Sequence, residues 1–184
     1  MDFFSTEVLC LRGVVRYYTL FVIDLSSRYV AICGTTESPN EEWMKQVARG
    51  LTDAFDGLCL GKRHLIIDRD TKYTETFKNL LKSSGVETVL CPIGAPKCNA
   101  YAESFVRSIK YECLNRIIPL GEEHLKLAIN QYLKHYNEER NHQGIENRLI
   151  KTEIMSREGD ITSQKRLGGM LTYYFARPLE LNDL

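Results

Sequence analysis

The first third of the chain carries short apolar runs, and this pattern predicts β-strands. Two of the runs, residues 14–23 and 28–33, are rich in β-branched and aromatic side chains, as strands are. A shorter run at residues 8–11 precedes them. Arg12-Gly13 and the segment from Asp24 to Ser27 provide short turns between the three runs. We therefore expect an antiparallel meander of three strands.

The periodicity changes to that of a helix after Ser38. Trp43, Val47, Leu51 and Phe55 follow one another at steps of four and form one apolar helix face. The remaining pattern predicts strand 64–68, helix 75–81, strand 86–90, helix 99–116 and helix 122–139. A meander followed by β-α-β crossovers favours an α/β fold. Its mixed five-stranded sheet would be antiparallel in the meander, parallel beyond it and flanked by helices.

The strength of the periodicity divides the chain into two parts. Residues 1–150 carry all the predicted strands and long helices, and we interpret them as one core domain. The pattern weakens over residues 151–184, where a Gly-Gly pair and the aromatic patch Tyr173-Tyr174-Phe175 stand out. We expect this second part to be a helical or arm-like appendage of the core.

Composition excludes several classes of protein. No apolar run approaches the roughly 18 residues of a membrane span, and the first residues lack the layout of a signal peptide. We therefore expect a cytoplasmic location, close to the nucleoid if the source is bacterial, and no membrane partner. The six cysteines include no CxxC pair, so we expect buried thiols rather than a zinc site or a disulfide scaffold.

Net charge bears on the question of a nucleic-acid partner. The chain has 24 basic and 24 acidic residues and a formal net charge of zero, whereas strong nucleic-acid binders are usually basic. This balance weakens a DNA-binding interpretation without excluding it. A nuclease-type core must carry acidic metal ligands, and partner domains can supply phosphate affinity.

Three acidic residues occupy positions from which their carboxylates can converge. Asp2 lies in the first strand, Asp68 ends the fourth, and Glu103 lies in the first turns of the helix after the fifth. Clustered carboxylates repel one another unless cations neutralise them, and oxygen ligands suit Mg²⁺ or Mn²⁺. Two such ions can activate a nucleophile and stabilise the leaving oxygen of a phosphodiester. Taken singly, each acid also fits an ordinary surface position.

The segments around these acids resemble motifs of the integrase core family, which includes retroviral integrases and a group of bacterial insertion-sequence transposases. The five segments are Asp2-Phe3-Phe4-Ser5, Tyr18 to Tyr29, Asp68 to Tyr73, Asn99 to Phe105 and Tyr136 to Gly144. Thirty-four residues separate Asp68 from Glu103, an interval typical of that family. The resemblance covers residues 1–150 and implies an RNase H-like fold with Asp2, Asp68 and Glu103 as catalytic metal ligands.

Two features depart from the family pattern. Asp70 stands where the family usually has glycine, but Asp68 directly follows the apolar strand and Tyr73 matches the family aromatic residue, so Asp68 remains the candidate. Asp2 follows only Met1, so the strand that should precede the first acid is missing. We expect either a truncated reading frame or a fragment of a longer protein.

Helical spacing identifies candidate DNA contacts. Glu103, Arg107 and Lys110 are four and three residues apart and share one helix face, whereas Phe105 and Ile109 lie on another that can face the core. The first three also fit a simple ion-paired helix surface. We predict that Arg107, Lys110 and Lys97 contact DNA phosphates. We interpret His64 and His142 as structural or solvated rather than catalytic.

The resemblance implies a homo-oligomeric polynucleotidyl transferase that cuts and joins DNA at element ends and target sites. It would use two Mg²⁺ or Mn²⁺ ions. One alternative is a truncated or domesticated core without catalysis, which binds DNA or self-associates. Another is an RNase H-like hydrolase without strand transfer, which the segment from Tyr136 to Gly144 makes the weaker alternative.

Overall fold

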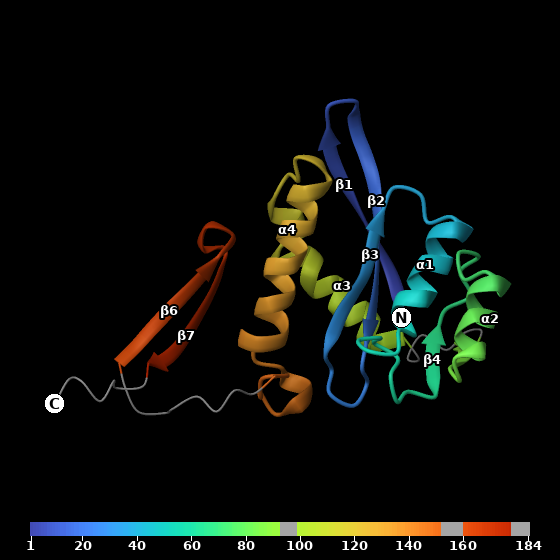
Figure 1. Cartoon of the computed structure of the whole chain (residues 1–184). Coiled ribbons are helices and arrows are strands. Elements are labelled where there is room, and N and C mark those ends of the chain that lie inside the picture. The colour runs from blue at the N-terminus through green and yellow to red at the C-terminus, as the bar shows by residue number, and fades with distance from the viewer. Residues whose placement is uncertain (93–98, 152–159, 178–184) are drawn as a thin grey trace.

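The computed structural model describes residues 1–92, 99–151 and 160–177 (Figure 1). Within this part of the chain, no helix combines the length and the apolar character needed to span a membrane. The predicted DNA contact Lys97 falls outside the described residues. Helices and strands alternate after an initial group of three strands, as the hydrophobic pattern predicts.

The predicted antiparallel meander is confirmed. It consists of β1 (Asp2–Cys10), β2 (Gly13–Ile23) and β3 (Val30–Thr36), with β2 in the middle. Asp2 lies opposite Phe21, and the β1–β2 pairing continues to Cys10 opposite Gly13. The first strand is therefore longer than the apolar run from which it was predicted.

A crossover follows the meander. It consists of α1 (Glu41–Leu51), β4 (His64–Ile67), α2 (Glu75–Ser83) and β5 (Glu87–Leu90). Strands β4 and β5 are parallel, a pairing that needs a crossover connection, which α2 provides here. The apolar face expected to reach Phe55 ends at Leu51, and Phe55 is 94% exposed. Asp53 accepts hydrogen bonds from the N–H groups of Phe55 and Asp56, which turns the chain away from the helix direction.

The prediction of one five-stranded sheet is not confirmed. In the described residues, β1–β3 form a three-stranded sheet, and β4 and β5 form a separate two-stranded sheet. The two sheets meet at Met1, whose terminal ammonium donates a hydrogen bond to the carbonyl oxygen of Ile66 in β4, at 2.9 Å. Ile66 lies within β4, and Met1 directly precedes β1, so this hydrogen bond links the start of the meander to the parallel pair.

Helices cover both faces of the meander (Figure 1). On one side lie α3 (Ala100–Glu112) and α4 (Gly121–Lys134), with short 3-10 turns at Leu114–Arg116 and Gln143–Ile145 and a π-helical turn at His135–Glu139. On the other side lie α1 and α2. The central strand β2 serves both cores: Phe21 packs with α3 and α4, and its neighbour Leu20 packs with α1 and α2.

The described part of the tail, residues 160–177, forms a β-hairpin. It pairs β6 (Asp160–Arg166) with β7 (Leu171–Arg177) through a 3-10 turn at Leu167–Gly169. Leu171 joins the apolar core beneath α3 and α4. The buried side chain of Arg166 forms an ion pair with Glu139 in the π-helical turn after α4, so a charged contact also attaches the hairpin to the core.

Candidate active site

Asp2 is held firmly at the start of β1. One carboxylate oxygen accepts the N–H of Phe3 at 2.7 Å, and the other accepts the side-chain amide of Asn99 at 2.9 Å. Burial and the nearby negative charge of Asp68 raise the pKa of Asp2, against the opposite effect of these hydrogen bonds. The two predicted acids Asp2 and Asp68 are therefore close enough to interact electrostatically.

Asp68 follows β4 directly, as predicted, and is half-buried. It accepts a hydrogen bond from the N–H of Asp70 at 3.3 Å. Together with Asp70, Tyr73 and Lys78, it lines a hollow of about 180 Å³. A carboxylate at the end of a buried strand, beside a hollow, can receive a bound cation.

Asp70, the departure from the family pattern, is already neutralised. Lys72 donates to both of its oxygens, with its ammonium at 2.6 Å and its backbone N–H at 2.9 Å. Although burial acts in the other direction, these contacts with Lys72 hold the pKa of Asp70 below its ordinary value. This pairing with Lys72 favours Asp68 over Asp70 as the candidate metal ligand.

Glu103 lies in the first turn of α3 and is exposed. Asn99, one turn earlier, contacts Asp2, and Tyr101 receives both a hydrogen bond and a cation–π contact from Arg28. Within the described ranges, no group of three or more His, Cys, Asp or Glu side chains is placed to hold a metal ion. The structure thus brings Asp2 and Asp68 together and puts Glu103 one helical turn from Asn99, outside a three-acid cluster.

The residues around Asp2 and Asp68 fit a hard divalent cation. Both acids offer oxygen ligands, which Mg²⁺ and Mn²⁺ prefer, and a cation would offset both the burial and the Asp68 charge that raise the pKa of Asp2. Next to them, the buried hydroxyl of Tyr73 has no hydrogen-bond partner in the part of the chain that the structure describes. A buried polar group without a partner is rare and is consistent with a site that binds an ion and its water.

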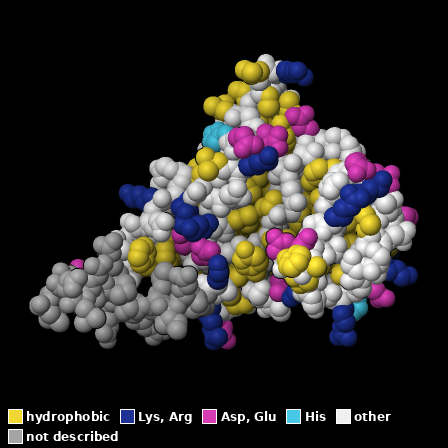
Figure 2. All heavy atoms as spheres, viewed as in Figure 1, with side chains coloured by type: hydrophobic (Ala, Val, Ile, Leu, Met, Phe, Trp, Pro, Cys, Tyr) yellow, Lys and Arg dark blue, Asp and Glu magenta, His cyan; other side chains and the backbone are white. Residues whose placement is uncertain are grey.

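The predicted DNA-contact face of α3 is arranged as helical spacing indicates. Phe105 and Ile109 are completely buried against the sheet, whereas Arg107 is exposed and Lys110 is half-buried. On the face shown in Figure 2, Lys and Arg side chains are scattered among Asp and Glu. The mixed charges agree with the zero net charge of the chain. Because the described residues of this face carry no large basic patch, we expect only a few residues to contact phosphates.

The segment from Tyr136 to Gly144 has a structural role. The side-chain amide of Asn137 donates to the Val30 carbonyl at 2.9 Å and accepts the Val30 N–H at 3.1 Å, which joins the π-helical turn after α4 to β3. Arg140 pairs with Glu112 of α3 at 2.7 Å, and His142 bonds the Tyr136 carbonyl at 2.7 Å. These contacts agree with the interpretation of His142 as structural.

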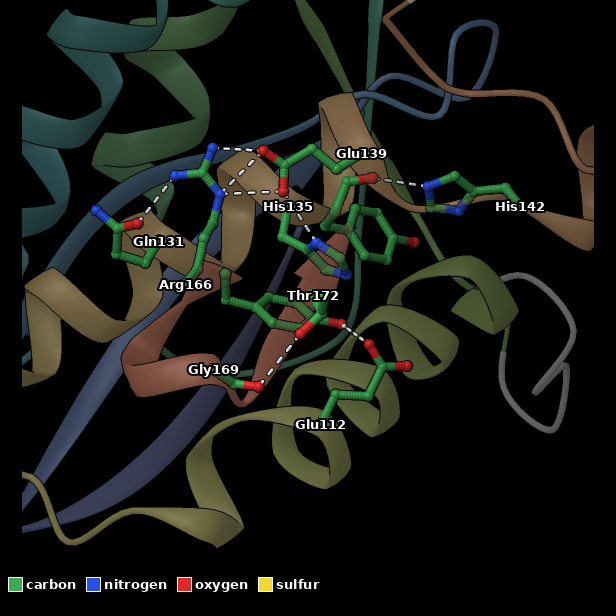
Figure 3. Close-up of polar contacts among 10 residues, drawn as sticks. Glu112, Gln131, His135, Glu139, His142, Arg166, Gly169 and Thr172 are labelled. Carbon is green, nitrogen blue, oxygen red and sulfur yellow. Dashed lines mark hydrogen bonds and ion pairs between the residues drawn. The ribbon is translucent and has the colours of Figure 1, made fainter. Parts of the chain in front are cut away.

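A second polar network holds the hairpin (Figure 3). Arg166 donates to both carboxylate oxygens of Glu139 and to Gln131, and His135 contacts Glu139 at 3.1 Å. Both charged side chains are only 7% exposed, so the pair is buried. The network lies on the α4 side of the sheet and belongs to the fold rather than to the acid site.

Sequence reasoning missed two residues of the acid site, Asn99 and Tyr73. Asn99 is four residues before Glu103 and therefore shares its helix face, a spacing that was visible in the sequence. Tyr73 was recognised only as a family aromatic residue. That its hydroxyl is buried beside the two aspartates could not be seen without the fold.

The fold and this site define an α/β protein with a carboxylate site where β1, β4 and α3 meet. Residues 84–149, just over a third of the chain, match the family model described as Integrase core domain. Of the three candidate acids, only Glu103 lies within the matched segment.

A solved structure resembles the whole fold. It is a chain of the cryo-EM structure of the simian T-cell lymphotropic virus intasome in complex with PP2A regulatory subunit B56 gamma, with a TM-score of 0.51 and 13% identity. The similarity covers 96% of this chain and 66% of that chain, so this protein spans less than two thirds of it. No curated protein sequence matches. The family match is confined to residues 84–149, and the similarity to the solved structure is one of fold.

Proposed function

We propose that this chain is the catalytic core of a DNA recombinase of the integrase or transposase type, which cuts DNA and transfers strands. The observation that carries the proposal is the proximity of Asp2 and Asp68 at the junction of the two sheets, with α3 joined to Asp2 through Asn99. The family match over residues 84–149 supports it.

In this proposal, Asp2, Asp68 and Glu103 hold Mg²⁺ or Mn²⁺, with two ions when DNA is bound. A bound cation lowers the pKa of an attacking water and stabilises charge on the phosphodiester oxygens. The protein orients the ligands: two hydrogen bonds fix Asp2, and the end of β4 fixes Asp68. Glu103 supplies the third carboxylate from the first turn of α3.

The proposed partners are DNA and further copies of this chain. Arg107 and Lys110 share the helix face of Glu103 and would contact phosphates beside the scissile bond. Lys97 is retained as a third proposed contact. A homo-oligomer is proposed because strand transfer acts on two DNA ends and a target.

Adjacent acids provide a sharp test of the metal site. Asp68→Asn keeps the shape of the side chain and removes its charge, so Mn²⁺-dependent cleavage of a labelled DNA duplex should be abolished. Asp70→Asn is the matched control, because Asp70 is already paired with Lys72, and it should retain most of the activity. Equal activity of Asp68→Asn and the unaltered chain would overturn the proposal.

A second candidate function is a core that binds DNA or self-associates without catalysis. It is favoured by one observation: the described residues hold no three-acid cluster. The same assay separates the two functions. The chain is the non-catalytic module if both the unaltered protein and Asp68→Asn shift the duplex on a gel and neither cleaves it with Mg²⁺ or Mn²⁺.

A further inference from the structure

Tyr73 is an unusual tyrosine because its ring and its hydroxyl have opposite environments. The ring packs among aromatic residues, 5.8 Å from Phe3 and 5.7 Å from Phe77 between centroids. The side chain is only 3% exposed. Its hydroxyl has no hydrogen-bond partner among the described residues. A phenylalanine would fill the same space without burying an unpaired polar atom.

The hydroxyl lies beside the candidate acid site. Tyr73 lines the same hollow as Asp68 and Asp70. Burial first, and then the negative charges of Asp68 and Asp2, raise the pKa of Tyr73, which indicates that the hydroxyl lies near both acids. The hollow has a volume of about 180 Å³, and Arg69 and Lys78 also line it.

A buried tyrosine elsewhere in the chain shows what a satisfied hydroxyl looks like. Tyr17 is 4% exposed, and its hydroxyl donates to Glu37 at 2.6 Å. The two tyrosines are therefore equally buried but differ in whether a protein group accepts their proton. Among the described residues, no group accepts the proton of the Tyr73 hydroxyl.

We infer that the Tyr73 hydroxyl is a positioning group of the acid site, which donates its hydrogen bond to the water shell of a divalent cation held by Asp2 and Asp68. The inference rests on the proposed metal site and adds a residue to it. It predicts two effects of opposite sign for one substitution. Tyr73→Phe removes an unpaired buried hydroxyl from the metal-free protein and removes a donor from the metal-bound one.

The experiment measures Mn²⁺ affinity by electron paramagnetic resonance and stability by urea unfolding with a chelator present. Tyr73→Phe should bind Mn²⁺ roughly three- to tenfold more weakly, the usual effect of one lost hydrogen bond. Its urea midpoint without metal should be unchanged or higher. Tyr17→Phe, which loses a satisfied hydroxyl, should unfold at lower urea and bind Mn²⁺ normally. Tyr111→Phe, at an exposed tyrosine of α3, should change neither quantity.

Three outcomes overturn the inference in distinguishable ways. If the unaltered chain binds no Mn²⁺, or if Asp68→Asn binds it equally well, the metal site fails and the role of Tyr73 fails with it. If the unaltered chain binds Mn²⁺ and Tyr73→Phe binds it equally tightly, only the role of Tyr73 fails. If Tyr73→Phe loses stability as Tyr17→Phe does, its hydroxyl has a protein partner and the inference is wrong.

Discussion

Asn99 donates its side-chain amide to Asp2 at 2.9 Å, across 97 residues of sequence. Asn99 is the N-cap residue of α3, yet it makes no side-chain cap hydrogen bond. The N-caps of the two earlier helices behave differently, since Asn40 and Thr74 each accept an N–H of their own helix. The Asn99 side chain therefore does not cap α3. It orients the candidate metal ligand Asp2 instead and holds the first turn of α3 beside it.

This arrangement predicts different consequences for two asparagines. Asn40→Ala should destabilise the protein by about 1 kcal/mol, because a helix cap is lost. Asn99→Ala should cost less stability and weaken Mn²⁺ binding several-fold, because Asp2 loses a partner that orients it. Urea unfolding and Mn²⁺ titration of both variants test this. Equal Mn²⁺ affinity of the two variants would reduce Asn99 to a structural contact.

The buried pair of Arg166 and Glu139 predicts a large effect on stability. Arg166→Ala leaves the Glu139 carboxylate buried without its main partner, and such a loss costs roughly 3–5 kcal/mol. Arg148→Ala is a control, because Arg148 pairs with Glu146 on an exposed surface and should change stability very little. Urea unfolding monitored by circular dichroism compares the variants. A change as small in Arg166→Ala as in the control would mean that the hairpin contributes little to the folded core.

Stability should fall as the pH decreases below neutral. Burial lowers the pKa of His142, against the effect of its hydrogen bond to Tyr136, so the unfolded chain takes up a proton at a pH where the folded chain does not. The contribution of His142 is complete above its ordinary pKa and is lost as the pH falls toward the folded value. Urea midpoints at pH 7.5 and 5.5 measure this loss. His142→Phe keeps a ring against Tyr136 and should show a smaller difference between the two pH values.

Binding of DNA by this chain should be weak and sensitive to salt. Each phosphate contact contributes roughly −0.9 to the slope of log affinity against log salt, so two or three contacts give a slope of about −2 to −3. Replacing Arg107 and Lys110 together with Ala should flatten the slope by nearly 2 units. Arg16→Ala, on the outer surface of the β1–β2 hairpin, is the control. Unchanged slopes would place the phosphate contacts elsewhere on the protein.

Local sequence patterns predicted most helices and strands, but they could not predict contacts between residues far apart in the chain. The meander was visible because runs rich in β-branched and aromatic residues, separated by short turns, encode it locally. The hairpin of residues 160–177 was not recognised as strands, because β6 is mostly polar and exposed and its attachment depends on Arg166 meeting Glu139, 27 residues earlier. Phe55 was assigned to a helix face because spacing alone cannot show that Asp53 ends the helical direction.

The candidate site was predictable to a similar extent. The position of Asp68 after an apolar strand distinguishes it from Asp70 in the sequence, and in the fold Asp70 pairs with Lys72. The choice of Asp68 as metal ligand stays a prediction. The proximity of Asp2 and Asp68 depends on how the two sheets meet at Met1, which no local pattern encodes. The partners of Asp2 and the environment of the Tyr73 hydroxyl likewise emerge only from the folded chain.

The most direct test of the metal site is anomalous diffraction from crystals of the unaltered chain soaked in Mn²⁺. The account predicts an anomalous peak within coordination distance of carboxylate oxygens of both Asp2 and Asp68, at the usual 2.0–2.2 Å or so for a small hard cation. No Mn²⁺ peak at these residues, or a peak bound by Asp70 in place of Asp68, would contradict it.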